Sequence, residues 1–323
     1  MKTVRFLPLC TGLFLLLIFS TESPAVTVFK TLSFASRDSV WVKNFRLFTE
    51  KVEKESGGNI RFNYVGGPEA IPPFEQIEAL KRGVIDVALI PGAYFVPQMP
   101  EADAMKLSEY LPWEEREKGI YKFYNTLMQE KLGVFYLGKV AGGIRYRFYL
   151  KKPIEKPSLS GLKIRVTPIY EPFVRALSGI PVTMAPGEVY IAIERGVVDG
   201  FGWPSIGVTD LGWQEVVKYT IEPGFYQTDV CILINLKVWD RLEEKTKKTL
   251  TGIIEKVEKE SYYFSQKTAE KERELLISKG LNIIEFKEDE AELYLSKAYA
   301  SGWERVIKKS PVNGKILKEM LKR

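Results

Sequence analysis

Residues 79–90 read Ala-Leu-Lys-Arg-Gly-Val-Ile-Asp-Val-Ala-Leu-Ile, and residues 192–203 read Ala-Ile-Glu-Arg-Gly-Val-Val-Asp-Gly-Phe-Gly-Trp. Both stretches contain Arg-Gly-Val-(Ile/Val)-Asp. Each is typical of a helix end, a Gly that closes the helix, and a short buried strand. Asp86 and Asp199 occupy matching positions in the two copies. Their matched context predicts a structural hydrogen bond at a turn or helix end rather than acid–base catalysis.

The surroundings of the two copies also match. Each copy is preceded by a strand, a helix and a strand, near 31–36, 39–55 and 60–65 for the first and near 162–167, 169–178 and 181–184 for the second. This β-α-β-α-β alternation predicts an α/β fold of mainly parallel sheets flanked by helices. We expect two lobes with a ligand cleft between them. The alternative is that both copies belong to one continuous sheet.

The connecting segments favour two lobes. Residues 144–150 alternate apolar and polar side chains, and 230–236 are mostly apolar, as expected for crossover strands at a hinge. Residues 242–278 predict a charged helix about 55 Å long, enough to brace both lobes. A strand at 281–286 and two helices then close the chain. We assign 26–147 plus about 236–265 to lobe I, and 148–235 plus about 266–323 to lobe II.

The N-terminus is typical of a secretory signal. Lys2 and Arg5 precede an apolar run at 6–20, and a small-x-small site places cleavage near Ala25. An uncleaved anchor is the alternative. After cleavage the chain would keep only one cysteine, Cys231, and so could form no internal disulfide. An export signal on a chain without an internal disulfide predicts location in a bacterial periplasm.

The composition argues against an enzyme. The chain contains no His, which excludes His-dependent nucleophilic catalysis and zinc sites with a His ligand. It also lacks a G-x-S-x-G elbow, a Walker loop and a G-x-G-x-x-G motif. We therefore expect no enzymatic activity, no cofactor and no metal. The net charge of +6 is spread among interleaved acidic and basic residues, which predicts no nucleic-acid binding.

Arginines are the first candidates for a binding site. Arg165 lies near the carboxyl end of the strand predicted at 162–167, the edge where open α/β sheets bind ligands. Its guanidinium is suited to hold a carboxylate by two hydrogen bonds. The alternative is a solvent-facing strand arginine. Arg145 and Arg147 share one face of a crossover strand, so one could reach a ligand while the other pairs with an acid, or both are surface charges.

Aromatic residues supply the next candidates. Trp203 and Phe201 lie at the carboxyl end of the second repeat strand, and Phe34 and Tyr94 hold comparable places in the first lobe. All four would face the predicted cleft, with ordinary core packing as the alternative. Glu69 lies in a tight loop, where it could accept a hydrogen bond from a ligand or cap the following helix.

The chain resembles DctP-type solute-binding proteins of tripartite ATP-independent periplasmic (TRAP) transporters. The matching stretches lie, in order, at 56–60, 78–88, 153–166, 181–184, 187–190 and 196–200. The resemblance implies two lobes that close on an organic acid and hand it to the membrane subunits of an ion-gradient-driven permease. It also implies that Arg165, in Lys-Ile-Arg-Val, makes the salt bridge to the ligand carboxylate, and that Arg145 corresponds to a second ligand arginine of sialic-acid-type members. We expect a monomer.

The sequence departs from that family pattern after Asp199-Gly200. Sialic-acid-type members have Gln-Glu-Asn-Pro there, and some keto-acid binders have an acid and a Trp with a metal. Here the stretch is Phe201-Gly202-Trp203-Pro204. It predicts a monocarboxylate with an apolar or aromatic body, such as an aryl, indolyl or 2-keto acid, against Trp203 and Phe201. The alternatives are a sugar-acid or dicarboxylate binder, or a ligand-sensing subunit for a signalling partner.

Overall fold

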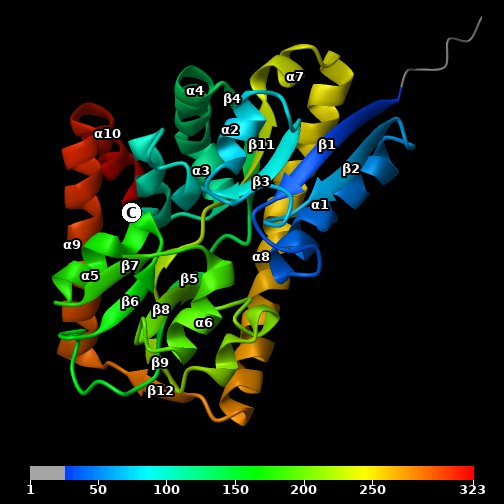
Figure 1. The fold of residues 1–323 in the computed structure, drawn as a ribbon. Coiled ribbons are helices and arrows are strands. Elements are labelled where there is room, and N and C mark those ends of the chain that lie inside the picture. The colour runs from blue at the N-terminus through cyan, green and yellow to red at the C-terminus, as the bar shows by residue number, and fades with distance from the viewer. Residues whose placement is uncertain (1–25) are drawn as a thin grey trace, which may run out of the picture.

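The computed structural model describes residues 26–323 and shows two lobes, each built on one sheet (Figure 1). The predicted signal segment and its cleavage near Ala25 lie outside the described residues. The first sheet has the order β2-β1-β3-β11-β4. Its strands are β1 (Thr27–Ser33), β2 (Ile60–Gly66), β3 (Val87–Pro91), β4 (Val134–Val140) and β11 (Val230–Asn235).

The second sheet has the order β12-β9-β5-β8-β6-β7, and β10 pairs with β5. Its strands are β5 (Arg145–Leu150), β6 (Lys163–Val166), β7 (Ile180–Thr183), β8 (Gly200–Pro204), β9 (Tyr219–Glu222), β10 (Phe225–Gln227) and β12 (Asn282–Glu285). The prediction of an α/β fold with two lobes is confirmed. The expectation of mainly parallel sheets needs correction, because both sheets are mixed: β11 runs antiparallel to β3 and β4, and β5 runs antiparallel to β8, β9 and β10.

Helices cover both sheets. They are α1 (Val40–Glu55), α2 (Gln76–Lys81), α3 (Pro112–Glu117), α4 (Ile120–Leu132), α5 (Glu171–Ala176), α6 (Val189–Glu194), α7 (Leu236–Asp240), α8 (Glu244–Ser278), α9 (Glu288–Lys309) and α10 (Pro311–Leu321). None of the helices within 26–323 combines the length and apolar character needed to cross a membrane.

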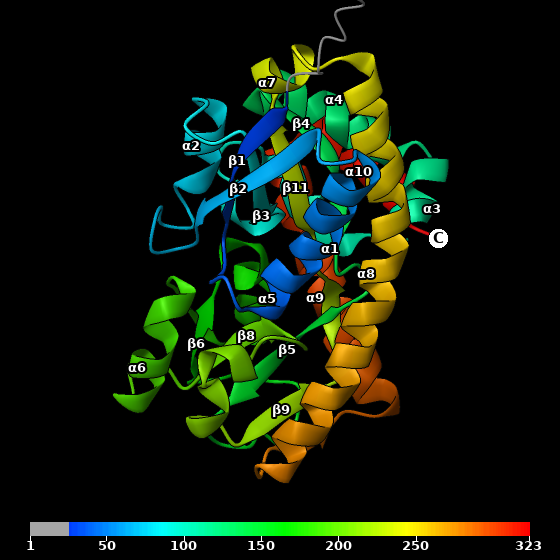
Figure 2. The same cartoon turned by 90° about the vertical axis from the view of Figure 1, so that its right-hand side faces the viewer.

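The long helix α8 runs beside both lobes (Figure 2). Near its middle, Glu258 accepts two hydrogen bonds from Arg116 of the first lobe. Nearer its end, Glu272 accepts hydrogen bonds from the backbone N–H groups of Gly207 and Thr209 in the second lobe. The predicted bracing helix therefore contacts both halves through buried carboxylates.

The repeat has the same local structure in both lobes. Asp86 Oδ2 accepts from the backbone N–H of Lys30 at 2.8 Å, and Asp199 Oδ2 accepts from that of Lys163 at 2.8 Å. The backbone N–H of each Asp donates back to the carbonyl of the same lysine. Both carboxylates thus fasten the repeat to the neighbouring strand, which confirms the structural reading of this pair.

Some segments lie in a lobe other than the one expected. Strand β11, expected in lobe II, pairs within the first sheet, and β5, expected partly in lobe I, belongs wholly to the second. At the C-terminus, Ser310 and Asn313 donate to the buried Glu101 carboxylate of the first lobe. The lobe to which each of these segments belongs is set by strand pairing and burial and not by its order in the chain. The full set of domain boundaries stays a prediction.

Candidate ligand-binding cleft

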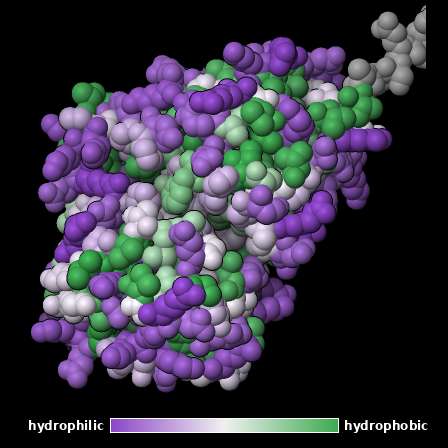
Figure 3. All heavy atoms as spheres, in the orientation of Figure 1, coloured by the Kyte–Doolittle hydropathy of each residue, from purple (hydrophilic) through white to green (hydrophobic). Residues whose placement is uncertain are grey.

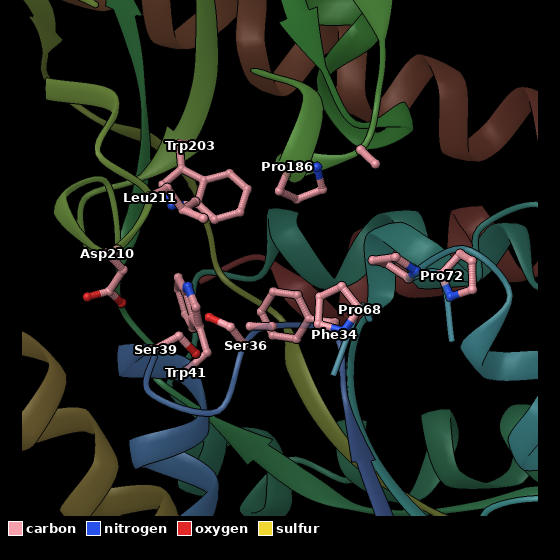
Figure 4. Close-up of a pocket in the computed structure, with 15 residues that line it drawn as sticks. Phe34, Ser36, Ser39, Trp41, Pro68, Pro72, Pro186, Trp203, Asp210 and Leu211 are labelled. Carbon is pink, nitrogen blue, oxygen red and sulfur yellow. The ribbon is translucent and has the colours of Figure 1, made fainter. Parts of the chain in front are cut away.

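A cavity of about 330 Å³ lies between the lobes, where strand ends of both sheets meet (Figure 4). Its lining is mainly apolar and comprises Phe34, Ala35, Ser36, Ser39, Trp41, Pro68, Pro72 and Pro73 from the first lobe, and Ala185, Pro186, Gly187, Trp203, Gly207, Asp210 and Leu211 from the second. The space-filling view is hollowed between the two lobes (Figure 3). We call this space the wide cavity.

A second, much smaller space adjoins the wide cavity. It measures about 20 Å³ and shares Phe34, Trp41 and Trp203 with it. Its remaining lining includes four residues whose side chains carry a hydroxyl group, Tyr94, Tyr146, Thr167 and Tyr170. We call it the narrow cavity.

Arg165 is fully buried close to the narrow cavity, although it lines neither space. Its Nε and Nη2 donate to the Met184 carbonyl at 3.1 and 2.8 Å, and Nη1 donates to the Tyr170 hydroxyl at 3.1 Å and the Gly202 carbonyl at 3.4 Å. Its guanidinium carbon lies 5.6 Å from the Trp203 ring centroid. Within residues 26–323 no carboxylate lies within 4.0 Å of this guanidinium.

The tyrosines beside Arg165 stay neutral at ordinary pH. Burial raises the pKa of Tyr94, and the nearby Arg165 charge only partly offsets this effect. Burial likewise raises the pKa of Tyr146 well above its usual value. Both hydroxyl groups therefore keep their protons and can donate hydrogen bonds to a ligand.

A buried acid lies behind these tyrosines. Asp229 has no hydrogen-bond partner for either carboxylate oxygen within the described residues, and burial raises its pKa from 3.8 to about 7. Lys139 of β4 and Lys106 of the first lobe counteract that rise, while Asp103 adds to it. Near neutral pH this carboxyl group therefore changes its charge inside the hinge region.

The two lobes touch at the edge of the wide cavity. Asp210 Oδ2 of the second lobe accepts from the backbone N–H of Val40, at the start of α1, at 2.8 Å. Beside it, Gly207 has a φ of +87°, and a Cβ at that position would lie 2.9 Å from Trp41 Nε1. A side chain there would hold the lobes apart, so glycine allows this close approach.

Three aromatic residues expected at the site line the cavities: Phe34 and Trp203 line both, and Tyr94 lines the narrow one. Phe201 lines neither. It packs in the core of the second lobe, with its ring centroid 5.0 Å from Tyr149 and 4.6 Å from Trp213.

The other polar candidates also lie away from both cavities. Arg145 is exposed and donates to the Tyr299 hydroxyl at 3.1 Å, and Arg147 pairs with Glu222 at 3.0 Å. Glu69 accepts from the backbone N–H of Gly67 at 2.7 Å, so it closes its own turn. The structure therefore brings together Arg165, Phe34, Tyr94 and Trp203, and leaves out Arg145, Phe201 and Glu69.

Trp41, Thr167 and Tyr170 also line the cavities and are not among the site residues expected from the sequence. Trp41 is the second residue of α1, directly after the loop that follows β1, and thus lies at a strand end like Phe34. Thr167 follows Arg165 by two residues and points from the same strand end. The rule that ligands bind at the carboxyl ends of strands, applied to all neighbours of the first candidates, would have found both.

Comparison with known proteins agrees with this architecture. The profile of the family described as "DctP: Bacterial extracellular solute-binding protein, family 7" matches residues 32–309. Among curated relatives, a solute-binding protein of Sulfitobacter sp. is 27% identical over 62% of this chain and 63% of its own length. The monocarboxylate 2-oxoacid-binding periplasmic protein of Nostoc sp. is 23% identical over 64% and 60%. These matches span less than two thirds of either relative.

Solved structures show the same fold. An extracytoplasmic solute receptor of Bordetella pertussis, solved as binding pyroglutamic acid, has a TM-score of 0.81 at 15% identity and covers 92% of this chain and 100% of its own. A TRAP periplasmic solute-binding protein of Desulfovibrio salexigens with bound orotic acid has a TM-score of 0.82 at 17% identity, covering 91% and 97%. The matched family is one of binding proteins, which confirms the expectation that the chain is not an enzyme. The chain belongs to the DctP family of bacterial extracellular solute-binding proteins.

Proposed function

We propose that this chain is the periplasmic receptor of a TRAP transporter. It binds a small organic acid in the interlobe cleft and delivers it, as a monomer, to the membrane subunits of an ion-gradient-driven permease. The names of similar proteins support an acid: they include a 2-oxoacid-binding and a C4-dicarboxylate-binding protein, and structures with pyroglutamic acid, orotic acid and D-glucuronate.

The observation that carries the proposal is the state of Arg165. A fully buried guanidinium without a carboxylate partner is costly, because the charge has left water without gaining a counter-ion. Its four hydrogen bonds use four of its five N–H groups, so one donor remains. The edge formed by Nε and Nη2 bonds only to the Met184 carbonyl, next to Ala185 at the wide cavity. A ligand carboxylate supplies the missing charge.

The lining of the wide cavity indicates the rest of the ligand. Prolines and the rings of Phe34, Trp41 and Trp203 dominate it, and its one charged side chain, Asp210, already accepts from the Val40 N–H. A sugar acid would leave several hydroxyl groups facing apolar walls. The favoured ligand is therefore a monocarboxylate with an apolar or aromatic body, such as an aryl, indolyl or 2-keto acid.

Binding proceeds by closure of the two lobes. An open cleft admits the acid, its carboxylate engages Arg165, and hinge motion brings the Gly207–Asp210 loop against Trp41 and Val40. Closure excludes water, which strengthens the ion pair because the local dielectric constant falls. The bound acid thus favours the closed form that presents both lobes together to the permease.

A thermal-shift panel tests this function. A ligand at 100 times its Kd adds about 2.7 kcal/mol of stability, a readable shift in Tm. Aromatic and branched monocarboxylates are expected to raise the Tm, and their primary amides are not. A Tm rise with sugar acids alone would overturn the apolar body, and equal shifts with acids and amides would overturn the carboxylate site.

A further inference from the structure

Asp229 lies on a segment that connects the two lobes. It falls between β10, which pairs with the second sheet, and β11 of the first sheet. Its neighbour Thr228 is fastened to the other crossover segment: the Thr228 N–H donates to the Ile144 carbonyl at 2.9 Å, and its hydroxyl donates to the Ala141 carbonyl. The Asp229 side chain is therefore carried by the hinge itself.

The carboxyl group of Asp229 is fully buried, and neither of its oxygens has a hydrogen-bond partner within the described residues. The two lysines whose charges act on it are engaged elsewhere. Lys139 Nζ donates to Glu115 at 2.8 Å, and Lys106 Nζ donates to Asp103. A buried carboxylate without a paired cation is costly, so this packing favours the neutral acid.

The same carboxyl group packs directly against the backbone of the first lobe. The N–H of Gly92 donates to the Asp229 carbonyl at 3.2 Å, and a Cβ at position 92 would lie 2.4 Å from Asp229 Oδ2. Gly92 begins the short turn that ends at Tyr94. Asp229 thus supports the turn that carries one wall of the narrow cavity.

Separation of the lobes changes the surroundings of Asp229. Tyr94 of the first lobe and Tyr146 of the second both line the narrow cavity, and the charge of Asp229 acts on both hydroxyl groups. Opening draws Tyr146 on β5 away from Tyr94, so water gains access to this region through the widened cavity. Hydration favours the ionised form of a carboxyl group that burial keeps neutral.

The other titratable groups around Asp229 do not supply this change of charge. Burial raises the pKa of Tyr124 and of Cys231 well above their usual values, so both stay neutral at ordinary pH. Burial lowers the pKa of Lys106, and the salt bridge with Asp103 opposes that shift. The chain contains no histidine, the residue that ordinarily titrates near neutral pH.

We infer that Asp229 is a proton switch in the hinge: its neutral form permits closure of the lobes, and its ionisation favours opening. Closure then takes up a proton, so the closed form is favoured at low pH and loses this advantage as the pH rises. The inference rests on the proposed function in one respect, because opening of the lobes is the step that releases the bound acid.

Double electron–electron resonance on the ligand-free protein tests the switch. Spin labels at Arg82→Cys and Arg195→Cys, exposed positions that directly follow α2 and α6, report the distance between the lobes. Cys231 is buried and stays unlabelled. The ratio of closed to open molecules is expected to fall at least tenfold from about pH 5 to about pH 8, since a difference of about one pKa unit between the two forms gives this factor.

Two neutral variants assign the effect to Asp229. Asp229→Asn and Asp229→Ala are each expected to keep a constant ratio of closed to open molecules across this range, close to that of the parent near pH 5. Glu258→Gln is the matched control. Burial also raises the pKa of Glu258, but this carboxylate lies on α8 and bonds to Arg116, so the tenfold fall should survive. Thermal unfolding checks that each variant folds.

The outcomes separate the switch from the proposed function. A ratio that does not change with pH in the parent would overturn the switch, and so would a tenfold fall that persists in both Asp229 variants. These results do not depend on an acid ligand, because none is present. A thermal-shift panel without any stabilising acid would overturn the proposed function and leave the measured distances unchanged.

Discussion

Replacing Arg165 by Ala should abolish most ligand affinity. The guanidinium is fully buried and makes four hydrogen bonds, none of them to a carboxylate, so a bound acid provides its only close counter-charge within the described residues. Removing one partner of a desolvated, hydrogen-bonded charge pair costs about 2–5 kcal/mol. The expected rise in Kd is therefore roughly 30-fold to 5,000-fold. Calorimetry with the best acid from the thermal-shift panel measures it.

Two further variants sharpen this test. Arg165→Lys keeps the charge and loses the planar fork, so it should also weaken binding, by less than Arg165→Ala. Arg145→Ala is the control, because Arg145 is exposed and donates to Tyr299 away from both cavities, and its Kd should stay within about threefold of wild type. An Arg165→Ala variant that binds within about threefold of wild type would refute the carboxylate site.

Three more predictions follow from the same geometry. Asp210→Ala removes the hydrogen bond with the Val40 N–H, so the ligand should dissociate about fivefold faster, which corresponds to roughly 1 kcal/mol. Stopped-flow fluorescence measures this dissociation rate. An unchanged rate would contradict the role of Asp210 in closure of the lobes. The pKa of Asp229 is about 7 in the folded protein and 3.8 in the unfolded chain. As the pH rises from about 4 to 7, the carboxyl group therefore ionises in the unfolded chain but not in the folded protein. The free energy of unfolding should fall over this range by roughly 4 kcal/mol in all. Denaturant titrations should show Asp229→Asn to be more stable than wild type at pH 8 and to lose this slope. Phe201→Ala should lower the unfolding free energy by about 3–5 kcal/mol and leave the Kd of the remaining folded protein unchanged, whereas Trp203→Ala should raise the Kd.

The fold was predictable because local patterns agree with tertiary structure. The repeat gave two equivalent strand–helix units, and its matched Asp residues keep the same hydrogen bond in both. The predicted helices at 39–55 and 242–278 correspond to α1 and α8 within two residues at each end. Their apolar periodicity is local, so it does not depend on which strands pair.

The assignment of strands to sheets was less predictable, because pairing is set by contacts between distant segments. The mostly apolar sequence of β11 is typical of a buried strand and would fit either sheet. Only its pairing with β3 and β4 places it in the first sheet. The crossover strand β5 has two possible faces towards the cleft. The structure turns Tyr146 to the narrow cavity and leaves Arg145 in contact with Tyr299.

Whether a residue belongs to the site depends on its distance from the end of the strand as well as on the face of the strand that it occupies. Phe201 and Trp203 are two residues apart on β8 and both contact Trp213, yet only Trp203 is near enough to the strand end to line the cavities. The alternation of residues along a strand shows that Phe201 and Trp203 share one face. It does not show how far along the strand the cavity extends. Trp41 lies in the first turn of the helix predicted at 39–55, and only the meeting of the two lobes makes it part of a site.

A crystal structure with the best-binding acid tests the central claim most directly. The quantity to measure is the distance between the ligand carboxylate oxygens and the Arg165 guanidinium nitrogens. The account predicts a contact of about 2.7–2.9 Å from the remaining Nη2 N–H to a carboxylate oxygen, as in a charge-assisted pair, with the body of the ligand against Trp203 and Phe34. A ligand whose carboxylate lies more than about 4 Å from Arg165, beyond hydrogen-bond reach, would contradict the account.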